Sequence, residues 1–326
     1  MQEGNMDTLK VVVDGLYRQG RNNLAVHLVA ENDQPLPAWQ PGAHIDVHLG
    51  NGLIRQYSLT GAATEQDGYL LCVAKESASR GGSRFIHETL RPGQTLTISA
   101  PRNVFPLAPA AKVILMAAGI GITPLYAMAE QLEATGTPFE LHYYIRQKGN
   151  AAFLRELSRP FRHGCCTIRY SCEGHSPRQH IPAGLLAPAP DSHLYLCGPQ
   201  GFMSHIISVA AANGWPEQNI HAEAFSPVSL PAPENTDETF RVTLASSGQS
   251  WSVPADRTIA SVLQENGVDV ALSCEMGMCG ACLTRVKEGA VDHRDTVQSE
   301  SEKNGPEQQI ALCCSRSFTA NLVLDL

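Results

Sequence analysis

Short runs of alternating hydrophobic and polar positions fill the N-terminal third of the chain. Turn signals separate these runs, among them Pro41-Gly42, Asn51-Gly52 and Pro92-Gly93. The runs cover residues 9–13, 24–30, 44–49, 57–60, 69–74 and 95–100. A period of two is typical of strands with one buried face, and this close spacing favours a small antiparallel barrel. We therefore expect a β-barrel domain at residues 1–108.

From Lys112 onward, apolar runs alternate with helical stretches. Strands are expected at residues 113–116, 139–145, 166–171 and 193–196, and helices at residues 124–134, 151–157 and 201–213. Alternation of strands and helices implies a parallel sheet with crossover helices. The pattern thus predicts an α/β domain at residues 109–225.

A segment rich in proline and polar residues follows, from Ser226 to Asn235. Such a composition favours a semi-extended linker. We place the linker at residues 226–237 and a third domain at residues 238–326.

Length and charge narrow the class of protein. A chain of 326 residues suggests two or three domains, and a formal net charge of −8 argues against nucleic acid as a partner. The longest apolar run, residues 113–122, is too short to cross a bilayer, and the acidic start lacks the apolar part of a signal peptide. Ten cysteines could form a disulfide framework, but four of them have metal-ligand spacing, and the absent signal argues for a reducing compartment. We expect a cytoplasmic monomer without a membrane partner.

The third domain is the most acidic part of the chain. Residues 238–326 hold twelve acidic residues and seven Lys or Arg residues, a formal charge of −5. Such a surplus favours either a docking face for a basic partner or plain solubility, and the charge count leaves both open.

The clearest chemical motif lies in this acidic domain. Cys274, Cys279 and Cys282 form a C-x4-C-x2-C run, and Cys313 or Cys314 supplies a later fourth thiol. This is the plant-type spacing for a [2Fe–2S] cluster, whereas structural zinc sites pair two short cysteine hooks. Gly277 and Gly280 lie within the run, where glycine lets backbone N–H groups approach sulfur.

Two segments of the barrel domain suit a phosphate-bearing cofactor. Arg55 and Tyr57 share one face of a predicted strand, which Ser58 follows. The turn Gly81-Gly82-Ser83 precedes a predicted helix at residues 85–90, so its free N–H groups can bind an anion, with Ser83 as the N-cap. Taken alone, the strand motif also suits a surface arginine beside a half-buried tyrosine.

Two further motifs end strands of the α/β domain. Gly119, Gly121, Thr123 and Pro124 follow the first strand, with Pro124 expected at the first helical position. Glycines at this edge let the pyrophosphate of a dinucleotide approach the backbone, although the motif is not G-x-G-x-x-G. At the end of another strand, Cys197-Gly198-Pro199 leaves room for a flat ring, and the alternative for Cys197 is a buried apolar side chain.

The choice of coenzyme depends on charges near the ribose. An acid suits a free ribose, whereas a 2′-phosphate needs arginine. Glu173, just after the strand at residues 166–171, favours NADH, while Arg146 and Arg178 keep NADPH open.

Taken together, R-x-Y-S, G-G-S, G-x-G-I-T-P, C-G-P and the cysteine run resemble the phthalate dioxygenase reductase family, over the full length and in order. The resemblance implies an antiparallel β-barrel flavin domain, an α/β parallel-sheet nucleotide domain and a β-grasp plant-type ferredoxin domain. It also implies that Arg55 and the turn Gly81–Ser83 hold the phosphate of FMN, which this branch uses in place of FAD.

The same resemblance assigns roles around the rings. Tyr57 would pack on the isoalloxazine, Ser58 would lie near its N5 atom, and Val73 to Lys75 would line its polar edge. Cys197 would lie near the nicotinamide C4 atom. Phe225 would cover the open face of the flavin and move aside for the nicotinamide. Family members often have Asp-Asp where this chain has Cys172-Glu173. The chain departs from the family pattern at the residue expected to contact the ribose.

In the ferredoxin segment, the resemblance selects Cys313 as the fourth ligand, because the family's last ligand is followed by one residue and then Ser-Arg. Cys314 would point the other way along a strand. His293 and Arg294 are expected to be structural or docking residues rather than ligands.

The implied function is the reductase component of a two-component system. Electrons would pass from NADH through FMN and the cluster to a Rieske-type terminal oxygenase. Members of this branch serve oxygenases of aromatic acids, methoxy-aromatics such as vanillate, and quaternary amines such as carnitine. Two alternatives are a self-sufficient flavin enzyme that reduces a small molecule directly and a zinc-stapled module without enzymatic activity.

Overall fold

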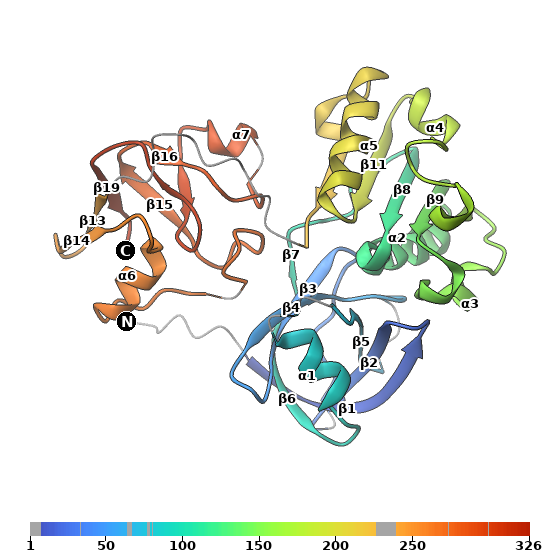
Figure 1. Ribbon diagram of the computed structural model, residues 1–326, viewed down its shortest axis with the longest axis horizontal. Coiled ribbons are helices and arrows are strands. Elements are labelled where there is room, and N and C mark those ends of the chain that lie inside the picture. Colours follow the sequence, from blue (N-terminus) through green and yellow to red (C-terminus); the bar gives the residue numbers. More distant parts are fainter. Residues whose placement is uncertain are drawn as a thin grey trace. The chain divides into compact units, whose positions relative to one another are not determined.

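The computed structural model describes residues 8–32, 34–63, 67–76, 79, 81–225, 239–272, 274–298 and 300–326. The chain divides into two compact units, Met1–Phe225 and Ser226–Leu326, which are described separately below (Figure 1). The linker predicted at residues 226–237 lies outside the described residues. Both predicted N-terminal domains fall in the first unit, so their boundary at residues 108 and 109 stays a prediction.

An antiparallel sheet forms the N-terminal part of the first unit. Its strands are β1 (Thr8–Gln19), β2 (Asn23–Ala30), β3 (Ala43–His48), β4 (Ile54–Ser58), β5 (Tyr69–Ala74), β6 (Thr95–Ser99) and β7 (Arg102–Asn103). They pair in the order β4-β3-β6-β1-β2-β5, with β7 beside β3. A bridge between Thr60 and Leu70 joins the two ends, so the sheet curves into the expected barrel around a core that includes Val11, Ile45 and Leu71.

One helix, α1 (Gly82–Glu88), packs on the barrel. It begins three residues before the start expected at residue 85, because Gly81 adopts a left-handed conformation with φ of 95° and turns the chain into the helix. Ile86 on its inner face joins the barrel core.

A five-stranded parallel sheet forms the rest of the first unit. Its strands are β8 (Lys112–Ala118), β9 (Phe139–Ile145), β10 (Gly164–Tyr170), β11 (Ser192–Cys197) and β12 (Ile220–Glu223), in the order β10-β9-β8-β11-β12. The helices are α2 (Ile122–Thr135), α3 (Leu154–Leu157), α4 (Ala183–Leu186) and α5 (Gln200–Ala212). Residues of α2 and α3 join one buried cluster and those of α4 and α5 another, so helices cover both faces of the sheet (Figure 1). This confirms the predicted parallel α/β architecture.

Some elements of this sheet differ from expectation. The helix predicted at residues 151–157 shrinks to the single turn α3, because Phe153 before it has a left-handed φ of 53°. The sequence pattern also missed the edge strand β12, whose short run Ile-His-Ala-Glu has no strong periodicity.

Hydrogen bonds join the barrel to the parallel sheet within this unit. In the β1–β2 turn, Arg21 N donates to Gly149 O at 2.7 Å and Asn23 Nδ2 donates to Asn150 O at 3.0 Å. Phe153 N donates to Gln19 Oε1 at 3.0 Å. These three hydrogen bonds attach the end of the β1–β2 hairpin to the segment that follows β9.

The second unit is a small mixed sheet with one main helix. Its strands are β13 (Phe240–Leu244), β14 (Ser250–Val253), β15 (Leu283–Glu288), β16 (Val291–Asp292), β17 (Gln309–Ala311), β18 (Arg316–Ser317) and β19 (Asn321–Leu324). They pair in the order β14-β13-β19-β15-β17, with β16 beside β18. Helix α6 (Ile259–Glu265) packs into the core and is N-capped by Thr258, whose side chain accepts from Ser261 N; α7 (Glu300–Lys303) is a single turn. The arrangement confirms the expected ferredoxin-type fold.

No helix among the residues described above combines the length and apolarity that a transmembrane span requires.

Candidate functional site

Arg55 and the glycine turn before α1 lie against each other. A Cβ atom added to Gly82 would come within 2.6 Å of Arg55 Cγ, so the arginine side chain crosses the start of the helix. The guanidinium also donates to the Ile54 carbonyl at 2.7 Å, which holds the side chain along its own strand. The structure therefore brings together the two segments that the sequence assigned to one phosphate.

Ser83 is not the N-cap that the sequence predicted. The N-cap of α1 is Gly81, and no side chain caps the helix. Ser83 lies inside the first turn, where its Oγ donates to Ser79 Oγ at 3.0 Å and accepts from Glu76 N at 3.3 Å. The N-cap prediction was wrong because the left-handed Gly81 starts the helix one residue before Ser83.

The residues predicted to meet the flavin ring differ in exposure. Tyr57 is partly buried against the barrel core, and burial raises the pKa of its hydroxyl well above the ordinary value. Ser58 is 7% exposed and pairs across the sheet with His44. Burial, followed by the charge of Arg102, lowers the pKa of His44 to about 4. The ring of His44 is therefore neutral at physiological pH.

The predicted polar edge of the ring lies at the end of β5. His87 Nε2 hydrogen-bonds the Val73 carbonyl at 2.8 Å. Lys75 Nζ forms an ion pair with Glu88 Oε1 at 2.9 Å and borders a hollow of about 540 Å³. Lys75 and Glu88 are each about half exposed, so this contact contributes little to stability.

The two glycine motifs of the parallel sheet converge on one point. A Cβ atom on Gly121 would collide with the carbonyl of Cys197 and lie 2.8 Å from Gly198 N. A Cβ atom on Gly198 would in turn lie 2.8 Å from Ala118 Cβ. Glycine is needed at both positions so that the ends of β8 and β11 can approach, and Pro199 then caps α5.

The helix after the first glycine motif starts earlier than expected. A 3-10 turn covers Gly119–Gly121, and α2 begins at Ile122, so Pro124 is the third helical residue and not the first. Proline is accepted there because the first N–H groups of a helix lack an intrahelical partner. Thr123 is buried, and its Oγ1 donates to the Ile120 carbonyl at 3.1 Å.

Sequence reasoning missed Glu223 as a member of the site. Glu223 faces Cys197 in the register of β11 and β12, and its Oε2 is closed off from solvent without a hydrogen-bond partner. Part of the residue still reaches the surface, but the carboxyl end is buried, and this burial raises its pKa to about 8. An acid beside Cys-Gly-Pro was visible in the sequence, but its burial depends on pairing with β11.

Cys197 is completely buried. Burial, and secondly the carboxyl of Glu223, raise the pKa of its thiol well above the ordinary value. The thiol therefore stays protonated, which suits a contact residue and not a nucleophile. Phe225 is half-buried and packs against the hydrophobic cluster to which Cys197 belongs.

Charges of both signs border the ends of β9 and β10. Glu173 lies exposed in the 3-10 turn Ser171–Glu173, and Arg146 and Arg178 are exposed nearby in sequence. The Arg146 carbonyl accepts from Cys172 N at 2.9 Å, which ties the two strand ends together.

A hollow of about 930 Å³ lies elsewhere in the first unit, between the β1–β2 turn, α3 and β10. None of the residues predicted to bind a cofactor lines it. We assign the cofactor site from the converging glycine turns, because close backbone approach is what binds phosphates and flat rings.

The four predicted ligand cysteines lie together in the second unit. Cys274, Cys279, Cys282 and Cys313 are each between 4% and 8% exposed. The thiols of Cys279 and Cys274 are hydrogen-bonded, and this bond, followed by burial, raises the pKa of the Cys279 thiol. The thiol of Cys313 contacts those of Cys274 and Cys282. The set thus combines all three members of the run with the later cysteine.

Backbone N–H groups point at these sulfur atoms. Cys274 Sγ accepts from Met276 N at 3.3 Å and from Met278 N at 3.5 Å. Cys279 Sγ accepts from Ala281 N at 3.4 Å. Gly277 and Gly280 each have a φ of 72°, the left-handed conformation that this wrapping requires.

Among the described residues, no three His, Cys, Asp or Glu side chains form the close group that would hold a single metal ion. A [2Fe–2S] cluster does not need such a group, because each iron takes two thiolates and shares two sulfides. The donor set therefore fits the cluster.

The surroundings of Cys314 differ from the prediction. Residues 312–314 form a turn and not a strand, so side chains do not alternate there. A Cβ atom on Gly277 would lie only 2.5 Å from Cys314 Sγ. The thiol of Cys314 also contacts the thiol of Cys313. Cys314 therefore packs beneath the cysteine loop and does not point away from it.

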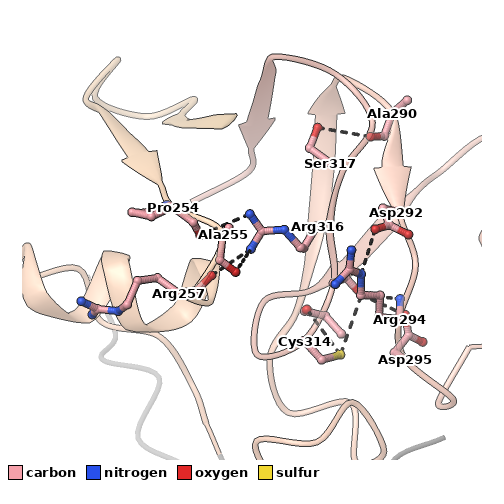
Figure 2. A network of polar contacts seen from close by, with 12 residues as sticks. Pro254, Ala255, Arg257, Ala290, Asp292, Arg294, Asp295, Cys314, Arg316 and Ser317 are labelled. Atoms are coloured by element: carbon pink, nitrogen blue, oxygen red, sulfur yellow. Dashed lines mark hydrogen bonds and ion pairs between the residues drawn. The ribbon is translucent and has the colours of Figure 1, made fainter. Parts of the chain in front are cut away.

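Arg294 is held by hydrogen bonds within the described unit, whereas the structural or docking role of His293 stays a prediction. Arg294 Nε donates to Asp292 Oδ2 at 2.8 Å, and Arg294 N donates to Ser315 Oγ at 3.1 Å. Figure 2 shows this pair beside Arg316, whose buried guanidinium donates to the carbonyls of Pro254 and Arg257 at 3.2 and 3.0 Å. These hydrogen bonds hold Ser315 and Arg316, which directly follow the segment of Cys313 and Cys314, in place.

Known proteins resemble the chain over its whole length. A family model described as "2Fe-2S iron-sulfur cluster binding domain" matches residues 242–317. A vanillate O-demethylase oxidoreductase of Pseudomonas sp. strain HR199 is 40% identical and covers 98% of this chain and 100% of its own length. The phthalate dioxygenase reductase of Burkholderia cepacia is 36% identical, over 98% of this chain and 97% of the relative.

A third relative is named as a reductase of a small molecule. The tetrachlorobenzoquinone reductase of Sphingobium chlorophenolicum is 36% identical, over 98% of this chain and 99% of its own length. Among solved structures, one described as phthalate dioxygenase reductase, a modular structure for electron transfer from pyridine nucleotides to [2Fe–2S], has a TM-score of 0.71. It is 35% identical, and the match covers 98% of each chain.

Proposed function

This chain belongs to the family of phthalate dioxygenase and vanillate demethylase reductases, and from that premise we propose that it passes electrons from NADH through FMN and a [2Fe–2S] cluster to a Rieske-type terminal oxygenase. The observation that carries the proposal is the presence, in one chain, of the Arg55–Gly82 contact, the Gly121–Cys197 contact and four clustered buried cysteines. When bound, the nicotinamide supplies two electrons as hydride, the flavin takes up the pair, and the cluster carries electrons singly.

In this proposal the barrel binds FMN. Arg55 and the turn Gly81–Ser83 would hold the phosphate, with Tyr57 against the ring and Ser58 near N5. Val73 and Lys75 line the polar edge. A guanidinium suits a phosphate because its planar donors bind two oxygens at once. Mass spectrometry of the cofactor released from the purified chain distinguishes FMN from FAD.

The parallel sheet binds NADH in the same proposal. Gly119, Gly121, Thr123 and Pro124 form the turn under the pyrophosphate, and Gly198 and Pro199 leave room for the nicotinamide beside Cys197. The orphan Oε2 of Glu223 requires a donor, and the carboxamide N–H group of nicotinamide supplies one. Phe225 would cover the open face of the flavin and would have to move aside for the nicotinamide.

Glu173 contacts the ribose hydroxyl groups in this arrangement, so NADH is preferred over NADPH. The test is the ratio of kcat/KM for the two coenzymes in the wild type and in Glu173→Gln. A ratio that favours NADH and falls in the variant supports the contact, whereas equal values for both coenzymes in the wild type contradict it.

Cys274, Cys279, Cys282 and Cys313 hold the cluster as thiolates, and the N–H groups of Met276, Met278 and Ala281 stabilise the charge on sulfur. We place the chain in the cytoplasm as a monomer, where such thiols stay reduced. The acidic surface of residues 238–326 then serves as the docking face for a basic patch on the oxygenase.

The experiment that tests the acceptor compares NADH oxidation with and without a purified Rieske oxygenase. Candidates are oxygenases of aromatic acids, methoxy-aromatics and quaternary amines. Rapid oxidation that needs the oxygenase, and weakens at high salt, supports the proposal. Turnover that no oxygenase accelerates contradicts it.

The second candidate is direct reduction of a small molecule such as a quinone. It is favoured by the relative named tetrachlorobenzoquinone reductase, which matches this chain over its whole length. Rapid NADH oxidation with a quinone alone, undiminished in Cys313→Ser, would support this function, because the cluster would then be dispensable.

A further inference from the structure

Asp295 lies between the two segments that supply the cluster cysteines. Its side chain has no exposed surface, and the residue is not itself one of the proposed ligands. A Cβ atom on Gly277 would come within 3.0 Å of Asp295 Cα and 3.1 Å of its Cβ. In addition, Thr296 N, one residue on, donates to the Gly277 carbonyl at 2.9 Å. Asp295 therefore packs directly against the loop that runs from Cys274 to Cys282.

The carboxyl of Asp295 also binds the second segment. Ser315, two residues after Cys313, donates from Oγ to Asp295 Oδ1 at 3.4 Å. Gln298 donates from its backbone N to Oδ2 at 3.1 Å and from Nε2 to Oδ1 at 3.2 Å. Figure 2 shows Asp295 beside Cys314 and Arg294. One buried side chain thus joins the loop of three cysteines to the turn of the fourth.

The imidazole of His293 also faces Asp295. Its Nδ1 lies 3.5 Å from Asp295 Oδ1, too far for a good hydrogen bond, and both ring nitrogens are buried without a hydrogen-bond partner. Three hydrogen bonds thus end on the buried carboxyl of Asp295, two from Gln298 and one from Ser315.

We propose that Asp295 is a positioning residue of the [2Fe–2S] site, which holds the two cysteine segments together and lowers the reduction potential of the cluster through its buried negative charge. Reduction adds one negative charge to the cluster. A fixed negative charge behind the loop opposes that addition, and the low dielectric of the interior makes the effect stronger than at the surface. The inference rests on the cysteine ligands proposed above.

The test is potentiometry of the full chain, followed by EPR of the reduced cluster. Asp295→Asn keeps the shape and an acceptor oxygen but removes the charge. We expect its midpoint potential to rise by about 59 mV, which for one electron corresponds to a tenfold larger equilibrium constant of reduction. The matched control is Asp292→Asn, which removes a carboxyl that is also buried but instead pairs with Arg294. We expect less than half of the shift there. Equal shifts in both variants, or a fall in potential in Asp295→Asn, would overturn the inference.

A second pair of variants tests the positioning role if Asp295→Asn loses the cluster. Gly277 and Gly280 have the same φ of 72°, so alanine strains the backbone equally at both. Only at Gly277 would the new methyl group meet Asp295 and Cys314, because the neighbours of Gly280 are 3.5 Å away. Iron content should fall severalfold more in Gly277→Ala than in Gly280→Ala, and equal retention would contradict the contact. A wild-type chain without cluster absorption would refute the proposed function instead.

Discussion

Cys197 lies directly beside Glu223 in the register of two neighbouring parallel strands, and the Oε2 atom of Glu223 is closed off from solvent without a partner. This carboxyl has a pKa raised to about 8 by burial. At neutral pH it is therefore mostly protonated and can hold a proton beside the nicotinamide pocket proposed here.

The stability of the first unit should depend on this carboxyl. In the unfolded chain Glu223 ionises near pH 4.5, whereas in the folded chain it ionises near pH 8. Its contribution is fully present below pH 4.5 and is lost as the pH rises towards 8, because the folded chain retains the proton that the unfolded chain releases. We expect Glu223→Gln, which cannot ionise, to unfold at the same temperature as the wild type at pH 5. At pH 9 it should be more stable by on the order of 5 kcal/mol, because each unit of the pKa difference corresponds to about 1.4 kcal/mol.

Thermal unfolding at pH 5, 7 and 9 measures this difference. The control is Glu173→Gln, which neutralises an exposed acid after β10, at the opposite edge of the same sheet, and should follow the wild type throughout. Parallel profiles for the wild type and Glu223→Gln would show that the carboxyl does not titrate as described.

The approach of two strand ends should make Gly121 intolerant of a side chain. In Gly121→Ala the methyl group meets the backbone of Cys197, so the ends of β8 and β11 must separate. We expect NADH affinity to fall at least about tenfold, equivalent to 1.4 kcal/mol. Gly201→Ala is the control, because it lies in α5 with open space around it and alanine favours the helix. Isothermal titration with NADH measures both, and equal affinities would contradict the contact.

Arg55 should decide how tightly the flavin is held. Replacing it with glutamine removes a charged donor from the start of α1, which costs about 1.5–3 kcal/mol in a hydrogen bond to an ion. Flavin affinity should therefore fall by about tenfold to a hundredfold. Arg91→Gln, which removes a guanidinium bound to carbonyls at the far end of α1, should leave it unchanged. Flavin fluorescence during dialysis reports the loss, and retention by Arg55→Gln would refute the phosphate assignment.

Cys313 and Cys314 should differ sharply although they are adjacent. The thiol of Cys313 contacts those of Cys274 and Cys282, whereas Cys314 packs on Gly277. Cys313→Ser should abolish the visible bands of the cluster, and Cys314→Ser should keep them. The opposite result in absorption and iron content would move the ligand to Cys314.

The sequence predicted the motifs at strand ends well, because glycines, prolines and cysteine spacings are local signals. Local signals did not indicate how those ends meet. The burial of Glu223 depends on its pairing with Cys197, and the approach of Gly121 to Cys197 joins residues that are far apart in the chain. Ser83 was wrongly predicted as an N-cap because the left-handed Gly81 moved the helix start. Cys314 was wrongly placed on a strand because alternation was assumed in what is a turn.

The most direct test of the central claim is the visible spectrum of the purified chain, recorded without oxygen before and after NADH. The account predicts flavin and [2Fe–2S] absorption in the resting protein, loss of both on adding NADH, and recovery on adding an oxidised Rieske oxygenase. A colourless protein, or bands that NADH leaves unchanged, would contradict it.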